Sequence, residues 1–177
     1  MTEALPLTRV VRVDALPREG QTVTIEASSS ERDGLAKLYG LPEIAALTAT
    51  LRVEPAGRGG ARVSGDVHGE LTQVCVVTLE PFAATVDEVV DVRFASPPEE
   101  ESPRRPARET LTLSLDDKDD PDPLVDGKID LGALSAEFFA LGLDPYPRKP
   151  GVEFVAPAEE GSPDSPFAAL AARRAKK

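Results

Sequence analysis

Alternating apolar and polar residues dominate the first half of the chain and predict β-strands. Residues 5–13 and 22–27 alternate in this way, and the turn-forming residues 17–20 separate them. Ser29 or Ser30 can then cap a short helix that continues to Tyr39 and stops at Gly40 and Pro42. The pattern therefore predicts two strands followed by a helix of about two to three turns.

Residues 44–94 predict a run of strands joined by tight turns. Residues 47–54 alternate, and the glycine-rich residues 57–60 turn the chain. Residues 61–68 run back to a second reversal at Gly69, residues 71–79 form a further strand that Pro81 ends, and residues 84–94 form a fourth. These strands indicate an antiparallel meander that is curled or barrel-like.

Residues 96–123 break the pattern, because they hold six prolines, an EEE run and the tract DDKDDPDP. We expect a long mobile acidic loop there, interrupted by a strand at residues 110–115. Asp130 can then cap a second helix that ends at Gly142. Its apolar residues recur at helical spacing, and Glu137 points outward; they are Leu131, Leu134, Phe138 and Leu141.

Residues 144–151 (DPYPRKPG) are too rich in proline for a helix or a sheet, and residues 152–155 form at most an edge strand. The predicted fold class is therefore α+β and mainly antiparallel β, a curled meander or barrel-like sheet with two short helices and a long acidic loop. We expect one domain over residues 1–155, with its mobile loop at about 96–123, and a flexible tail over residues 156–177.

The composition narrows the setting in which such a fold works. Hydrophobic residues make up 41% of the 177 residues, but aromatic residues only 5%, so the core must consist mainly of Val, Leu, Ile and Ala. Cys75 is the single cysteine and excludes an intramolecular disulfide. No apolar run is long enough for a membrane span, and the first residues lack the order of a signal peptide. We therefore expect a cytoplasmic protein.

The formal net charge of −11 is concentrated in one stretch. Residues 87–126 contain thirteen Asp and Glu against five Lys and Arg, a net −8, and the rest of the chain is only −3. RNA contact remains possible away from that stretch, whereas the stretch itself suits a basic partner such as a ribosomal protein, or serves only solubility. The candidate contacts in it are the tract aspartates Asp116, Asp117, Asp119 and Asp120.

Catalytic and metal-binding arrangements are weakly supported. Cys75 and His68 are the only thiol and the only imidazole, seven positions apart around the expected Gly69 turn, so a nucleophilic pair is geometrically possible. The structural alternative is a buried, inert cysteine and a surface histidine. Two such ligands are too few for structural zinc, and the loop from Asp122 lacks oxygen ligands where calcium needs them. We expect no catalytic, cofactor-binding or metal-ligating residue.

Two short segments resemble the YceD family: CVVTLEP at residues 75–81, and DGKIDL at residues 126–131 before the second helix. The resemblance spans roughly residues 5–155 and leaves out the tail. Many members carry Cys-x-Arg-Cys-Leu-x-Pro at the strand end. This chain lacks the arginine and the second cysteine of that pattern. It therefore lacks the pair of cysteines that suggests a metal site in those relatives. The motif residues carried over are Cys75, Leu79, Glu80, Pro81, Asp130 and Leu131. The ending after the second helix looks like an alphaproteobacterial-type variant, with Arg148 and Lys149 at the place of a histidine.

The resemblance implies a non-catalytic factor in ribosome biogenesis. Family members are implicated in accumulation of large-subunit ribosomal RNA and are commonly encoded next to a small large-subunit ribosomal protein. The implied partners are the ribosomal RNA precursor or a basic ribosomal protein, with no DNA and no membrane. Tyr146, Arg148 and Lys149 are the candidate contacts, because a proline-flanked loop can present a ring and two cations to RNA. The alternative for Tyr146 is that it packs on the sheet. Two alternatives concern the whole protein: the acidic stretch shields a basic ribosomal protein, or Cys75 and His68 are catalytic residues of an unrecognised enzyme.

Overall fold

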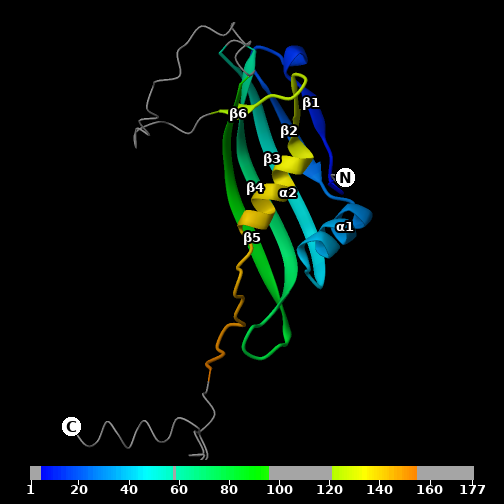
Figure 1. The fold of residues 1–177 in the computed structure, drawn as a ribbon, viewed down its shortest axis with the longest axis vertical. Coiled ribbons are helices and arrows are strands. Elements are labelled where there is room, and N and C mark those ends of the chain that lie inside the picture. The colour runs from blue at the N-terminus through cyan, green and yellow to red at the C-terminus, as the bar shows by residue number, and fades with distance from the viewer. Residues whose placement is uncertain (1–4, 58, 96–120, 155–177) are drawn as a thin grey trace, which may run out of the picture.

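Three long antiparallel strands form the centre of the fold (Figure 1). They are β3 (Glu43–Ala56), β4 (Gly60–Val74) and β5 (Pro81–Ala95) in a computed structural model that describes residues 5–57, 59–95 and 121–154. β2 (Gln21–Glu26) pairs with β3 at one edge, and the short β6 (Asp122–Pro123) pairs parallel to β5 at the other. Because β2 and β6 are separate edges, this five-stranded sheet is not a closed barrel. The predicted α+β, mainly antiparallel class is confirmed.

Both helices cover the same face of this sheet (Figure 1). α1 (Ser29–Tyr39) packs on β3, and α2 (Leu131–Leu141) packs on β4 and β5. The helices meet where the Tyr39 hydroxyl donates to the Ala136 carbonyl at 2.9 Å and the Tyr39 and Phe139 rings lie 6.2 Å apart. A small sheet of β1 (Val10–Arg12) and β7 (Lys128–Asp130) precedes α2, and a 3-10 turn, η1 (Val13–Ala15), follows β1.

The core lies between the sheet and the helices and follows the predicted alternation. The apolar residues assigned to one face of β3 are all buried; they are Leu47, Ala49, Leu51 and Val53. Val63 and Val67 of β4 and Val86 and Val90 of β5 continue this inner face. Each fully buried Val or Leu contributes about 1.5–3 kcal/mol. Phe139 of α2 adds a fully buried aromatic ring to this layer.

Ser28, rather than Ser29 or Ser30, caps α1. The Ser28 hydroxyl accepts from the Glu31 amide, and the Glu31 carboxylate accepts from the Ser28 amide at 2.8 Å, which satisfies otherwise unpaired donors of the first turn. Gly40 ends the helix at a φ of 66°, as predicted. The expected cap was wrong by one residue because three consecutive serines are equally good caps in sequence.

The reversal predicted at Gly69 is wrong. β4 continues through Gly69 to Val74, the turn lies at residues 75–80, and Pro81 begins β5 instead of ending a strand. A Cβ at Gly69 would collide with the Phe139 ring of α2, so this glycine lets the helix approach the sheet. His68 is consequently in the middle of a strand and not at a hairpin end.

Smaller corrections concern the ends of the domain. Of residues 5–13 only Val10–Arg12 form a strand, and residues 152–154 form none. α2 has the predicted Asp130 cap and exposed Glu137, but it buries Phe139 more deeply than Phe138 and leaves Leu141 70% exposed. Residues 122–123 of the expected loop pair as β6. The predicted strand at 110–115, most of the acidic loop and the tail lie outside the described residues.

Candidate functional site

The turn between β4 and β5 is built by its own backbone. Cys75 donates its amide to the Glu80 carbonyl and accepts the Leu79 amide on its own carbonyl, both at 2.9 Å. Leu79 has a φ of 59°, a conformation that L residues other than Asn and Asp rarely adopt, and its side chain is 76% exposed. The turn therefore holds a large apolar side chain in solvent on a strained backbone.

The Cys75 thiol is buried, as expected, but its surroundings are polar. The Thr78 hydroxyl donates to the sulfur, and backbone amides of Lys149, Thr78 and Val77 add further donors. These donors outweigh desolvation and lower the pKa of the Cys75 thiol to about 6. The polar donors around the sulfur thus join the turn to residue 149.

Cys75 and His68 lie far apart, so the nucleophilic pair kept open as an alternative does not form. The residues are separated by an extended strand, which places them about 20 Å apart at about 3.3 Å per residue. The His68 Nδ1 lies 2.6 Å from an Asp87 carboxylate oxygen across β4 and β5, on the sheet face away from the helices. The two groups cannot share a substrate atom in this fold.

Residues 144–149 are fixed against the turn at several points. The Val76 amide donates to the Pro147 carbonyl at 2.9 Å, and the Gln73 side chain donates to the Asp144 carbonyl at 3.2 Å. Lys149 forms an ion pair with Glu80, with Nζ and Oε2 3.0 Å apart. We call residues 75–80 and 144–149 together the clasp. The clasp brings together the YceD-like motif at the strand end and the proline-flanked loop that was predicted to contact RNA.

Four exposed side chains of the clasp define what we call the clasp surface: Val76, Leu79, Tyr146 and Arg148. Tyr146 is 73% exposed and Val76 is 45% exposed, so the alternative in which Tyr146 packs on the sheet is wrong. Tyr146 and Arg148 flank Pro147, whose carbonyl accepts from Val76, and this bond keeps these three residues together. The surface offers an aromatic ring, a guanidinium and aliphatic groups on a pinned backbone.

Sequence reasoning selected Tyr146 and Arg148 but missed Val76 and Gln73. Lys149, also selected, is engaged with Glu80 and serves to hold the clasp. Gln73 is only 7% exposed and continues the buried side of β4, where apolar residues alternate. A glutamine in such a position was the available signal, because a buried amide requires a polar partner.

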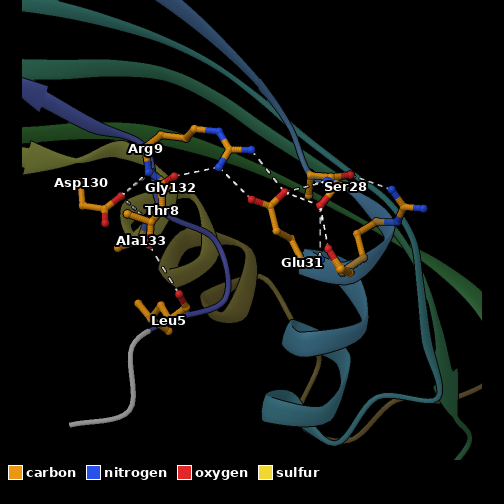
Figure 2. Close-up of polar contacts among 11 residues, drawn as sticks. Leu5, Thr8, Arg9, Ser28, Glu31, Asp130, Gly132 and Ala133 are labelled. Carbon is orange, nitrogen blue, oxygen red and sulfur yellow. Dashed lines mark hydrogen bonds and ion pairs between the residues drawn. The ribbon is translucent and has the colours of Figure 1, made fainter.

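Asp130 and Leu131, from the second motif, join elements distant in sequence. Figure 2 shows the contacts of Asp130. One Asp130 carboxylate oxygen accepts from the amides of Gly132, Ala133 and Arg9, and the Leu131 amide donates to the Arg9 carbonyl at 2.9 Å. The Arg9 guanidinium reaches Glu31 of α1 at 2.8 and 3.2 Å and, with the Ser28 amide, lowers the pKa of Glu31 to about 2. This part of the motif is thus structural and fixes both helices relative to the N-terminal segment.

The described residues contain no group of three or more His, Cys, Asp and Glu side chains that could hold a metal ion. No helix in the described part of the chain is long and apolar enough to cross a membrane. The predicted contacts Asp116, Asp117, Asp119 and Asp120 lie outside the described residues.

Comparison with known families gives one informative match. The profile described as "Large ribosomal RNA subunit accumulation protein YceD" matches residues 63–172. The chain belongs to the YceD family. The YceD match begins inside β4 and includes β5, the clasp and α2. It starts later than the expected residue 5 and continues into the tail, beyond residue 155, where the resemblance was expected to end. No curated protein and no solved structure matches the chain.

Proposed function

We propose that this chain supports accumulation of large-subunit ribosomal RNA by binding a component of the assembling subunit at the clasp surface, without catalysing a reaction. The family description supports a role in accumulation of large-subunit ribosomal RNA. The observation that carries the binding role is the exposure of Leu79 and Tyr146, at 76% and 73%, on a backbone pinned by hydrogen bonds and by the Lys149–Glu80 ion pair. Such a role places the chain in the cytoplasm with the ribosomal precursor.

The chemistry of the clasp surface suits recognition. Tyrosine and arginine are the residue types most enriched among those that dominate binding energy, and both also stack on unpaired RNA bases. Fixing their backbone before binding reduces the entropy lost on association. The partner is the ribosomal RNA precursor or a ribosomal protein bound to it.

A non-catalytic role is supported by the placement of the best catalytic candidates. The buried Cys75 thiol belongs to the clasp, and His68 lies about 20 Å away beside Asp87. A substitution test separates the two readings. His68→Gln, which leaves the clasp untouched, should leave ribosomal RNA accumulation intact; loss of accumulation in a stably folded variant would support an enzyme.

Depletion of the protein tests the proposed process. After depletion, sucrose-gradient profiles should show fewer large subunits and a lower ratio of large- to small-subunit ribosomal RNA. Re-expression of the chain should restore both. An unchanged ratio in fully depleted cells would contradict the proposal.

A second candidate is a module that shields a basic ribosomal protein, and the charge favours it. The chain has 31 acidic against 20 basic side chains, with the excess concentrated in residues 87–126. Changing the five aspartates of residues 116–120 and 122 to asparagine should then abolish capture of the basic protein and leave the clasp surface unaltered. Retained capture would exclude this candidate.

A further inference from the structure

A groove lies at the start of α2, where residues of β1, β6 and β7 line it together with that helix. β1 and β6 lie near this end of α2, and the chain leaves the other end of the helix toward the clasp (Figure 1). Its volume is about 370 Å³, within the range of about 300–1,000 Å³ that is typical of ligand sites. Its apolar lining comes from Val10, Phe94, Val125, Ile129, Ala133 and Leu134. We call it the α2 groove.

Large aliphatic side chains in the α2 groove are exposed to solvent. Val125 is 71% exposed and Val10 is 54% exposed, although both line the same groove as the well-buried Leu134 and Ile129. When another apolar group covers exposed apolar groups beside a concave surface, the free energy of the system falls. The groove therefore suits a partner that inserts an aliphatic side chain.

The charged side chains at the rim of the groove determine which partners it attracts. Among the lining residues that the structure describes, Asp122, Asp130 and Glu137 are acidic and Lys128 is the one cation. Asp122 and Glu137 are exposed, and Glu137 is on the outward side of α2. An acidic rim around an apolar floor attracts a segment in which lysines or arginines flank an aliphatic residue, and it repels an RNA phosphate backbone.

We propose that the α2 groove binds a short basic amphipathic segment of a partner protein, with an aliphatic side chain on the apolar floor and cations on Asp122 and Glu137. This deepens the proposed function by naming one class of partner for a second surface. It requires neither the clasp surface nor RNA. Binding of a peptide in vitro therefore succeeds or fails independently of ribosomal RNA levels in cells.

The test uses the full-length chain and a fluorescein-labelled helical peptide of leucine, alanine and lysine, with leucines on one face. Fluorescence polarisation should show saturable binding that weakens with salt, because exposed charge pairs are screened. A peptide with glutamate in place of lysine, and one with serine in place of leucine, should both fail to bind. Binding by either control peptide would overturn the proposed recognition.

Matched variants locate the site. Val125→Ser and Glu137→Lys should each weaken peptide binding about tenfold. Val89→Ser and Glu70→Lys make the same changes on the sheet face away from the helices, where Val89 is 72% exposed, and should leave binding unchanged. Equal effects of the two sets would overturn the proposal.

Two other occupants give distinct results that would also overturn it. If Val125→Ser converted a dimer into a monomer in analytical ultracentrifugation, the groove would serve contact with a second copy. If the peptide bound only after Arg173, Arg174, Lys176 and Lys177 were changed to glutamine, the chain's own basic terminus would occupy the groove.

Discussion

At the scale of single residues, Leu79 combines backbone strain with exposure. A non-glycine residue at a φ of 59° costs about 1–2 kcal/mol, and the leucine side chain recovers little by burial because it is 76% exposed. A glycine would remove this cost, yet the position holds a leucine. Strain kept at an exposed apolar residue is typical of a recognition site.

Leu79→Gly should therefore leave the free energy of unfolding unchanged or raise it by up to about 1 kcal/mol, since relief of strain is partly offset by glycine's greater freedom when unfolded. The same variant should weaken binding to the assembling subunit. Leu38→Gly, in helix α1, provides the control and should lower stability, because glycine is a poor helix former. Urea denaturation measures the free energy of unfolding of both variants. A clear loss of stability in Leu79→Gly would contradict the account of the turn.

The Cys75 thiol makes a second prediction at this scale. Its pKa falls from an ordinary value of 9.0 to about 6, so the folded state favours the thiolate. This contribution to stability is fully present above pH 9 and is lost as the pH falls through about 6. The stability difference between the wild type and Cys75→Ser should therefore grow from pH 6 to pH 9. A constant difference, measured by urea denaturation with thiolate absorbance as a check, would contradict it.

At the scale of elements, the Arg9–Glu31 pair joins the N-terminal segment to helix α1. Arg9 and the Ser28 amide lower the pKa of Glu31 from 4.5 to about 2, so the stabilisation is present above pH 4.5 and lost as the pH falls through about 2. The stability advantage of the wild type over Glu31→Gln should shrink across that range. Asp33→Asn, on the same helix, is the control. An advantage independent of pH would exclude the charged pair as its source.

Gly69 sets the distance between β4 and α2. Gly69→Ala should lower the free energy of unfolding by about 1–3 kcal/mol, because its Cβ collides with the Phe139 ring. Phe139→Leu in the same chain should recover part of this loss, since the smaller side chain leaves room. Thermal or urea denaturation of the single and double variants measures the coupling. Additive losses would show that the two residues do not compete for the same space.

These elements show how far the sequence predicts the fold. The alternation of Leu47 to Val53 and the Asp130 cap identify β3 and α2 because each signal is local. The β4–β5 turn was misplaced because alternating apolar residues continue through Cys75 and Val77, while Gly69 resembles a turn residue. Only the contact with Phe139, far along the chain, explains that glycine.

At the scale of the whole molecule, the candidate site depends on long-range contacts. Tyr146 and Arg148 could be selected from the proline-rich loop by residue type alone. The contacts of this loop with Val76 and Gln73, and the ion pair of Lys149 with Glu80, could not be predicted from the sequence. These partners lie about seventy residues away along the chain. The fold separates the clasp surface from the α2 groove, and this separation makes the two proposed contacts independent.

The most direct test of the central claim is the ratio of large- to small-subunit ribosomal RNA in cells whose own protein is replaced by a clasp-surface variant. Tyr146→Ala with Arg148→Glu alters exposed side chains and should leave the protein folded and at normal abundance. Arg18→Glu makes the same charge change at another exposed arginine. The account predicts that the double variant leaves the ratio as low as depletion does, whereas Arg18→Glu restores it. Full restoration by the folded double variant would contradict the account.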